Sequence, residues 1–453
     1  MIALIILFVS GLLSLFIAFT KKPWTVLLVA SVGLIASAAS LVYESKYGSV
    51  LQFDGLEFTS FAIFYGVVAI IFAFLLILTA YASFKETPEH TGDYIGLLLF
   101  SLCGAIIMFA FTDMFMFFLG LEILSIPVYV MAGSKKSDLR SSEASLKYFL
   151  TGAFSTGVVL FGIAWVYGGT GSFKLSEINT AILAQDTASP LIYVGMLMIM
   201  ASFLFKIGAT PFHFWSPDVY DGSPIVVTGF MASIVKLAGF AAFLKMFSLA
   251  FGSLHDFWAP ALGFIAVITM FVGNLSAIKQ IRFKRLLAYS SIAHVGYALL
   301  TLVMQSDKSS FNLMAYLFAY GFSIIALVTV ALLINDKDDK IESFKGLARR
   351  NPFVGFVAVV ALLSMAGVPP LMGFFGKYLV FAEAIYEYPL LVGIALLNSG
   401  IGVYYYLRIV ILTVQRPEEG LVVSEKHKVP ALQWFVLAVC AAAILFGGNM
   451  LIF

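Results

Sequence analysis

The stretch FMFFLGLEILSIPVYV, residues 115–130, holds a single charged residue, Glu122, in an otherwise largely apolar run. Such a run is typical of a helix that crosses a bilayer, which needs roughly 20 predominantly apolar residues. The whole chain shares this character, because hydrophobic residues make up 61% of its 453 residues and charged residues only 11%. A soluble domain has about 45–50% apolar and about 25% charged residues. So few charges cannot cover a water-facing surface, and the sequence therefore predicts an all-α integral membrane protein.

Fourteen segments are apolar and long enough to be candidate spans: 1–20, 23–43, 58–83, 93–112, 113–134, 143–169, 190–215, 223–251, 257–279, 283–304, 311–335, 351–386, 388–414 and 429–452. The run 94–134 is too long for one span, and the polar pair Thr112-Asp113 predicts a tight turn between its two helices. Segment 1–20 lacks the basic start and the cleavage site of a signal peptide, so we expect a retained helix. The longest loop, around 168–190, has only about twenty residues, which argues against a soluble domain.

The loop charges predict the orientation of these spans. Numbered from the amino terminus, the odd loops carry eighteen cations: Lys21, Lys22, Lys85, Lys135, Lys136, Arg140, Lys279, Arg282, Lys284, Arg285, Lys337, Lys340, Lys345, Arg349, Arg350, Arg416, Lys426 and Lys428. The even loops carry four, which are Lys46, Lys174, Lys245 and Lys308. Because cytoplasmic loops are enriched in Lys and Arg, we expect the odd loops in the cytoplasm. Both termini then lie on the outer, periplasmic side, which requires an even number of spans.

Two classes of binding partner are not indicated by the composition. The net charge of +2 gives no reason to expect nucleic-acid binding. The two cysteines, Cys103 and Cys440, lie in apolar stretches and form neither a metal-binding nor a disulfide pattern. The sequence therefore predicts no metal site.

Five of the 27 lysines and arginines fall inside the apolar spans: Lys147, Lys206, Lys236, Lys377 and Arg408. A charge at the bilayer centre costs roughly 2.5–3.5 kcal/mol on insertion scales, so such residues usually have a function. A desolvated lysine can release its proton near neutral pH, whereas an arginine stays charged. We therefore expect the four lysines to handle protons. A nearby carboxylate such as Glu122 raises the proton affinity of a lysine, and moving it away lowers that affinity.

Several of these charges also have a structural interpretation. Arg408 lies in the last turns of its span, where its side chain can reach the cytoplasmic surface. Glu143 and Lys147 have the i,i+4 spacing of a helical ion pair. The other lysines could form buried salt bridges between helices, but the one mid-membrane acid, Glu122, cannot pair with three of them.

Two histidines are further candidates. His294 lies in the middle of a span, in SSIAHVGY (residues 290–297). Because histidine titrates near neutral pH, it is either a proton relay or a hydrogen-bonded packing residue. His213 is a weaker candidate of the same kind.

Prolines lie beside three of the intramembrane charges: Pro127 after Glu122, Pro211 after Lys206 in FKIGATPFHFW, and Pro369-Pro370 before Lys377 in MAGVPPLMGFFGK. Proline inside a helix removes a hydrogen bond and kinks or breaks the helix. In a membrane such a break is tolerated where it is buried in protein or faces water. A packing kink is the alternative, but broken helices with ionisable residues near the midplane mark the ion path of many transporters.

The seventh and twelfth spans are both proline-broken and lysine-bearing, five spans apart. A repeated unit of five spans must invert its orientation, because five is odd. This placement predicts three helices in residues 1–92, an inverted pair of five-helix repeats at 93–251 and 257–414, and a loop with the last helix at 415–453.

Several segments together resemble a known family. They are FTDMFMFFLGLEILSIPVYVMAG (111–133), SLKYFLTGAFSTGVVLFGIAWVYGGTGS (145–172), LFKIGATPFHFWSPDVYDGSPIVVTGFMASIVKLAGF (204–240) and GVPPLMGFFGKYLVF (367–381). They resemble the subunit N family of the proton-pumping NADH:quinone oxidoreductase, respiratory complex I. The resemblance runs from about residue 94 to 415, and the combination of PDVYDGSP, SIVKLAGF and GFFGK is specific to subunit N.

The resemblance implies the antiporter-like fold of fourteen helices, with two inverted five-helix repeats. It implies a proton pathway through a midplane chain of charges, coupled to quinone reduction elsewhere in the complex. The matching residues are Glu122 on helix five, Glu143 and Lys147 on helix six, Lys206 on broken helix seven, Lys236 on helix eight and Lys377 on broken helix twelve. His294 joins them as the candidate relay. One position departs from the family, since Val235 stands before Lys236 where proline is usual, which puts a break in helix eight in doubt.

The resemblance also implies an enzyme subunit without a redox centre of its own. NAD, FMN, iron–sulfur clusters and quinone are expected in other subunits. The expected partners are other membrane-arm subunits, including the neighbouring antiporter-like subunit M, and the lipid bilayer. The expected location is the cell inner membrane, with an organellar inner membrane or a thylakoid membrane as the other settings of such complexes.

Three alternatives remain open at this point. An Mrp-like antiporter subunit moving Na⁺ or K⁺ should have clustered intramembrane acids, whereas here only Glu122 lies at mid-depth and Glu383 nearer an outer end. A related complex can take its electrons from ferredoxin or F420 with a similar subunit. A scaffold protein should not need titratable lysines beside broken helices.

Overall fold

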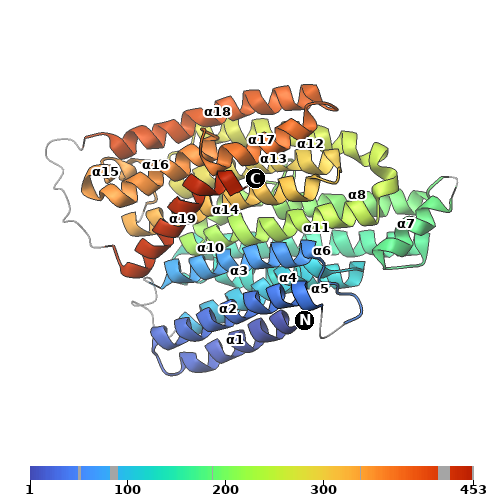
Figure 1. Cartoon of the computed structure of the whole chain (residues 1–453), viewed down its shortest axis with the longest axis horizontal. Coiled ribbons are helices and arrows are strands. Elements are labelled where there is room, and N and C mark those ends of the chain that lie inside the picture. The colour runs from blue at the N-terminus through green and yellow to red at the C-terminus, as the bar shows by residue number, and fades with distance from the viewer. Residues whose placement is uncertain (49–52, 82–89, 186, 337, 417–428, 451–453) are drawn as a thin grey trace. The chain divides into compact units, whose positions relative to one another are not determined.

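The computed structural model describes residues 1–48, 53–81, 90–185, 187–336, 338–416 and 429–450 (Figure 1). Every regular element in these ranges is a helix, and β pairing is limited to isolated bridges. Twelve helices are long and apolar enough to cross a membrane, and two shorter apolar helices, Ile2–Ala18 and Pro352–Ala366, accompany them. The predicted all-α membrane class is therefore confirmed.

One compact unit comprises Met1–Trp215, Gly222–Pro224 and Ile234–Ala261. Its main helices are α1 (Ile2–Ala18), α2 (Pro23–Tyr47), α3 (Ser60–Ala80), α4 (Thr91–Ala110), α5 (Met114–Ala132), α6 (Leu139–Thr170), α7 (Leu175–Leu183), α8 (Pro190–Ile207) and α11 (Lys236–Leu249). Helix α4 packs against α1, α3 and α5, and α6 packs against α8. At the α6–α8 crossing, a Cβ on Gly162 would lie 2.8 Å from the carbonyl oxygen of Gly195. Such small residues let membrane helices approach closely.

The second unit comprises Ser216–Asp221, Ile225–Ser233 and Leu262–Phe453. It holds most of α9 (Trp215–Gly222) and α12 (His255–Ile278), together with α10 (Ile225–Phe230), α13 (Phe283–Met304), α14 (Ser309–Ile334), α15 (Leu347–Arg350), α16 (Pro352–Ala366), α17 (Met372–Ala384), α18 (Pro389–Val414) and α19 (Ala431–Met450). Helix α14 is its centre, because it contacts α10, α13, α16, α17 and α19.

Capping residues fix several helix ends where the sequence predicts them. Helix α4 ends at Ala110 and α5 begins at Met114, so the turn expected at Thr112-Asp113 is confirmed. The Asp113 carboxylate accepts a hydrogen bond from the Met116 N–H at 2.7 Å, as an N-cap should.

Two of the three proline sites interrupt a helix. Helix α8 ends at Ile207 and α9 begins at Trp215, while α16 ends at Ala366 and α17 begins at Met372. At the third site the helix is continuous, because α5 runs through Pro127. Proline removes one hydrogen bond, and a membrane helix with neighbours on both sides can continue past such a loss. At the two true breaks a glycine in the left-handed region, Gly208 or Gly367, ends the preceding helix.

Two other expectations need correction. Lys245, counted among the loop cations, lies inside α11 and is half-buried. The segment around 168–190 is not simply a loop, because α6 extends to Thr170 and α7 follows. Lys85, Lys337, Lys426 and Lys428, which were also counted as loop cations, lie outside the described residues.

Within each unit, loops of the same parity meet. In the first unit the second, fourth and sixth loops are joined by the bridges Leu56–Phe111 and Asp113–Lys174. In the second unit the ninth and eleventh loops are joined by the bridge Arg282–Lys340. The tenth loop also contacts the end of α17, which leads into the twelfth loop. Ser309 Oγ donates a hydrogen bond to the Glu383 carboxylate there at 3.1 Å. Such a pairing is what the predicted alternation of spans implies, since it would place every second loop on the same face.

The break between α16 and α17 depends on a glycine. A Cβ on Gly373 would lie 1.9 Å from the carbonyl oxygen of Ser364 and 2.6 Å from its carbonyl carbon. Backbone atoms would have to move, so we expect Gly373→Ala to destabilise the fold by about 1–3 kcal/mol, as overpacking typically does. The measurement is the midpoint of thermal unfolding of the detergent-solubilised protein. Gly393→Ala on α18, where a Cβ would meet nothing within 4 Å, is the control, and equal midpoints for both variants would contradict the prediction.

Candidate functional site at the two helix breaks

Lys206 lies in the last turn of α8, immediately before the first break. Its side chain is buried, with 5% exposure, and its Nζ donates to Ser125 Oγ at 2.5 Å. The rings of Tyr129 and Tyr148 each lie 5.9 Å from the ammonium, in cation–π range. Trp215, the first residue of α9, connects the two sides of the break, because its Nε1–H donates to the Phe205 carbonyl of α8 at 3.0 Å. The ammonium is thus surrounded by neutral groups.

Glu122 approaches this lysine through hydroxyl groups. Its carboxylate accepts from Thr156 Oγ1 at 2.7 Å. A small cavity is lined by Thr156, Ser125 and Lys206, together with Ser155, Ser202 and the ring of Tyr129. Among the described residues, no ion pair within 4.0 Å joins Glu122 to Lys206. Glu122 is thus bonded to one residue that lines the Lys206 cavity, Thr156, and Lys206 is bonded to another, Ser125.

Lys236 begins α11 and is 4% exposed. A π-helical turn, Met231–Val235, directly precedes it. A π turn inserts one residue into a helix and is common at functional sites. The helix is therefore irregular before Lys236 even though Val235 replaces the usual proline. A Cβ on Gly239, one turn further along, would lie 3.8 Å from Lys206 Cγ. The lysines of α8 and α11 thus lie on contacting helices of one unit.

Lys377 lies on the other side of the second break, in the second turn of α17. It is 6% exposed, and its Nζ donates to the Ala366 carbonyl at 3.0 Å and to Ser399 Oγ at 2.9 Å. Ala366 is the last residue of α16, so the ammonium satisfies a carbonyl that the break leaves free. The Tyr297 ring centroid lies 5.2 Å from Nζ. This lysine, like Lys206, is buried among neutral partners.

His294 is buried on α13 and is hydrogen-bonded at both ring nitrogens. Its Nδ1 lies 2.6 Å from the Tyr316 hydroxyl, and its Nε2 lies 3.0 Å from the Tyr406 hydroxyl. A second small cavity is lined by His294, Tyr316 and Lys377 with Tyr320, Ser323 and Ser364. The structure therefore brings the predicted histidine and Lys377 to one cavity, as it brings Lys206 to the other.

The charged pair of α6 lies apart from both cavities. Lys147 Nζ and Glu143 Oε1 are 2.7 Å apart, and their side chains are 42% and 63% exposed. The two residues form an ion pair on an exposed face, and neither lines the Lys206 cavity. Arg408 donates to the Gln280 carbonyl at 3.4 Å, near the end of α18. These two groups fit the structural interpretation better than the buried lysines do.

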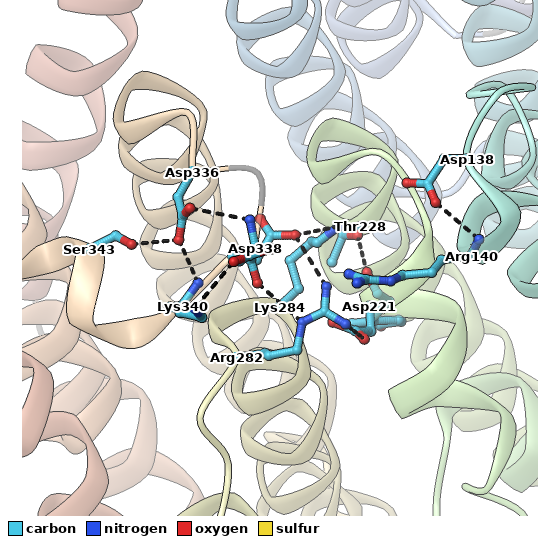
Figure 2. Close-up of polar contacts among 12 residues, drawn as sticks. Asp138, Arg140, Asp221, Thr228, Arg282, Lys284, Asp336, Asp338, Lys340 and Ser343 are labelled. Atoms are coloured by element: carbon cyan, nitrogen blue, oxygen red, sulfur yellow. Dashed lines mark hydrogen bonds and ion pairs between the residues drawn. The ribbon is translucent and has the colours of Figure 1, made fainter.

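A cluster of ion pairs joins three loops of the second unit (Figure 2). From the sequence, its basic residues were counted only as loop cations, and their acidic partners were not predicted. Arg282 pairs with Asp221 at 2.5 Å, Lys284 with Asp339 at 3.0 Å, and Arg285 with Asp218 at 2.7 Å. Asp218 and Asp221 belong to α9, the second half of the broken helix, and the cations belong to the start of α13 and the residue before it. The cluster thus ties the broken helix to the helix that carries His294.

The carboxylates of these loops differ in their environment. Burial raises the pKa of Asp221, although Arg282, Lys284 and Arg285 act in the opposite direction. The pKa of Asp336 is lowered, because hydrogen bonds from Ser343 Oγ and from two backbone N–H groups outweigh its partial burial. Asp336 therefore stabilises its loop at neutral pH, and this contribution is lost as the pH falls through its folded-state pKa.

The pair Asp218–Arg285 can be tested by a double-mutant cycle. Each side chain is 35% exposed, so we expect a coupling energy of about 1 kcal/mol, between the values for exposed and buried pairs. Asp218→Ala, Arg285→Ala and the double variant are compared by thermal unfolding. The double variant should lose less stability than the sum of the single losses. Strictly additive losses would show that this pair does not hold α9 to α13.

Comparison with known proteins places this geometry in a family. Residues 112–402 match the family described as NADH:quinone oxidoreductase/Mrp antiporter, TM. The chain is 36% identical to NADH-quinone oxidoreductase subunit N of Cytophaga hutchinsonii, over 98% of this chain and 97% of that relative. It is 30% identical to a chain of respiratory complex I from Thermus thermophilus, with a TM-score of 0.82 over 99% of this chain and 97% of the other. A chain of the Mrp complex from Dietzia sp. DQ12-45-1b, 18% identical, shares the fold, with a TM-score of 0.83 over 99% and 95%.

Proposed function

Since the chain belongs to the NADH:quinone oxidoreductase/Mrp antiporter family, we propose that it is a proton-translocating, subunit N-type component of the membrane arm of an NADH:quinone oxidoreductase. One observation carries the proposal. At each of two helix breaks, a buried lysine with neutral hydrogen-bond partners lines a small cavity to which several hydroxyl-bearing residues also contribute. Such a lysine can bind and release a proton near neutral pH, because the hydrocarbon environment disfavours its charged form.

In the first unit we assign proton transfer to Lys206 and Lys236, with Glu122 as the group that tunes them. The Glu122 carboxylate acts on Lys206 across the cavity that Thr156 and Ser125 share. A carboxylate at this range stabilises the ammonium, and a change in its distance or charge shifts the proton affinity of the lysine. Glu143 and Lys147 are assigned to the same path through the family resemblance alone, because their ion pair is exposed.

In the second unit we assign proton transfer to Lys377 and His294. Lys377 is six residues from Glu383 on α17, which is about 9 Å of helix. Glu383 accepts from Ser309 and Asn312 at the start of α14, and these residues follow a loop expected on the outer side. In the other direction, α16 separates the break from the cytoplasmic loops by 15 residues. This placement supports release of protons from Lys377 toward the outer face.

The topology that goes with this function has fourteen spans, in two inverted five-helix repeats at 93–251 and 257–414. Three helices at 1–92 precede the repeats, and the last helix follows within 415–453. Both termini lie on the outer side, and the membrane is the inner membrane of the cell. The meeting of loops of like parity within each unit supports this alternation.

The proposed partners are the other membrane-arm subunits, including the neighbouring antiporter-like subunit M. Quinone reduction in those other subunits, which would hold NAD, FMN, iron–sulfur clusters and quinone, supplies the energy. A sodium- or potassium-moving role of the Mrp type fits less well, because both cavities are lined by a lysine, and a positive charge repels a metal cation.

Lys206 is the residue that tests the proposal. We expect Lys206→Ala to leave the complex assembled in its host membranes and to lower NADH-driven proton pumping by about 10-fold or more, given the roughly 10²–10⁴-fold that a proton-transfer group contributes. Lys206→Arg should fail as well, because arginine keeps its proton. Pumping is measured as the quenching of a pH-sensitive dye by membrane vesicles, together with the rate of NADH oxidation.

Lys174→Ala is the matched control. Lys174 is a lysine of the same unit, but it is 57% exposed and pairs with Glu177, so its loss should leave pumping unchanged. Normal pumping by the Lys206→Arg variant would refute the role of lysine titration in this subunit.

A further inference from the structure

We propose that Ser290, Tyr406, His294 and Tyr316 form a proton wire that leads from the cytoplasmic half of the second unit to the cavity of Lys377. The inference rests on the proposed function, and it adds an entry branch that the charged residues alone do not provide. Its three hydroxyl residues come from three helices, α13, α18 and α14. Their arrangement around one imidazole ring carries the proposal.

The groups form an unbroken series of hydrogen bonds. Ser290 Oγ is hydrogen-bonded to the Tyr406 hydroxyl, which lies 3.0 Å from His294 Nε2. The opposite ring nitrogen, Nδ1, lies 2.6 Å from the Tyr316 hydroxyl. All four side chains are buried, with exposures of at most 6%. Each hydroxyl can donate one proton and accept another, and neutral imidazole has one donor and one acceptor nitrogen.

The transfer balances without leaving a charge on the wire. A proton arriving from water at Ser290 displaces the hydroxyl proton of Ser290 to the Tyr406 oxygen, and Tyr406 gives its own proton to His294 Nε2. The ring releases the proton on Nδ1 to the Tyr316 oxygen, and Tyr316 releases its proton into the cavity, where neutral Lys377 accepts it. The ring ends as the other tautomer with every hydroxyl reoriented. Rotation of the hydroxyls and exchange of the tautomer reset the wire.

Both ends of the wire lie where the proposed function needs them. Tyr316, His294 and Lys377 line the same cavity, so the inner end of the wire and the proton acceptor face one space. Ser290 is five residues beyond Arg285, about 7.5 Å of helix rise. Arg285 belongs to the ion-pair cluster of the odd loops, which are expected in the cytoplasm. The wire therefore delivers protons from the cytoplasmic side, while Lys377 releases them toward the outer side.

The same helices contain a second buried network that offers a comparison. The Tyr405 hydroxyl donates to Asn274 Oδ1 at 3.0 Å, and Asn274 Nδ2 donates to the Tyr297 hydroxyl at 3.0 Å and to Asn398 Oδ1 at 3.3 Å. Amides hold their protons tightly, so this network is suited to binding helices together. Tyr405 and Tyr406 are adjacent and equally buried, with 1% exposure each. The Tyr405 hydroxyl meets an amide and also contacts Tyr406 and Ser290, but of the two tyrosines only Tyr406 is hydrogen-bonded to the imidazole.

The experiment compares Tyr406→Phe, Tyr405→Phe and Lys377→Ala in the assembled complex, in host membranes. Tyr406→Phe keeps the ring and removes the relay oxygen, so we expect NADH-driven pumping to fall about 10-fold, which is less than the roughly 10²–10⁴-fold that a direct proton-transfer group contributes. The solvent deuterium isotope effect on the remaining turnover should rise, because proton delivery becomes rate-limiting. Tyr405→Phe should keep pumping and the isotope effect near the unmodified values. Lys377→Ala should abolish most pumping.

The outcomes separate this inference from the proposed function. Normal pumping in Tyr406→Phe with loss in Lys377→Ala would overturn the wire and leave the lysine path standing. Normal pumping in Lys377→Ala would refute the proposed role of Lys377 itself. Equal losses in Tyr405→Phe and Tyr406→Phe, with matching thermal midpoints and no change in the isotope effect, would show that any missing buried hydroxyl has the same effect, and would also overturn the wire.

Discussion

The structure depends on how two lysine side chains are held inside apolar helices without a carboxylate in direct contact. Lys206 is bonded to a serine hydroxyl, and Lys377 to a serine hydroxyl and a helix-terminal carbonyl. Neutral acceptors satisfy the hydrogen-bonding capacity of an ammonium, but they offset only a small part of the free energy lost when its charge is buried. In general, burial among neutral partners brings the charged and neutral forms of a lysine closer in free energy than they are in water. A group in this condition can exchange a proton with small changes in its surroundings.

The helix breaks are the structural means of reaching that condition. A continuous helix uses its own carbonyls, whereas the end of α16 offers the Ala366 carbonyl to Lys377. Glycines in the left-handed region end both α8 and α16, and a small cavity lined in part by hydroxyl-bearing residues lies at each break. The π-helical turn before Lys236 provides a third irregularity, where a lysine again begins the helical segment that follows. A break, a cavity and a buried lysine thus occur together at Lys206 and at Lys377.

Much of this arrangement could be predicted from the sequence, for identifiable reasons. Long apolar runs locate membrane helices, and a polar pair such as Thr112-Asp113 within a run marks a turn, because its side chains cap helices. The prolines beside Lys206 and Lys377 indicated the two breaks. Sequence reasoning did not decide between a break and a continuous helix at Pro127, where α5 is continuous, because local sequence does not reveal how the surrounding helices support the backbone. It also missed the π turn, which has no residue signature, and it misplaced Lys245, because a cation near a helix end resembles a loop cation.

The hydroxyl groups were beyond sequence reasoning for a different reason. Serine, threonine and tyrosine are frequent in this chain, and only the packing of α13, α14 and α18 selects Ser290, Tyr316 and Tyr406 around His294. Likewise, exposure separates the Glu143–Lys147 pair from the buried lysines, although all of them lie in helical segments. Residue type and spacing identify which groups can titrate, whereas tertiary contacts decide which of them share a cavity.

In the proposed function, the Lys377 cavity exchanges protons with water from the outer face. Labelling of a cysteine at Ser364, which lines this cavity, tests it most directly, in a chain whose Cys103 and Cys440 are replaced by alanine. A small, membrane-impermeant thiol reagent is added to either side of sealed vesicles that contain the assembled complex. We expect the thiol reagent to label Ser364→Cys when it is added to the outer side. It should not label Ala30→Cys, because Ala30 is buried in the middle of α2. Reaction only from the cytoplasmic side, or equal inertness at both positions, would contradict it.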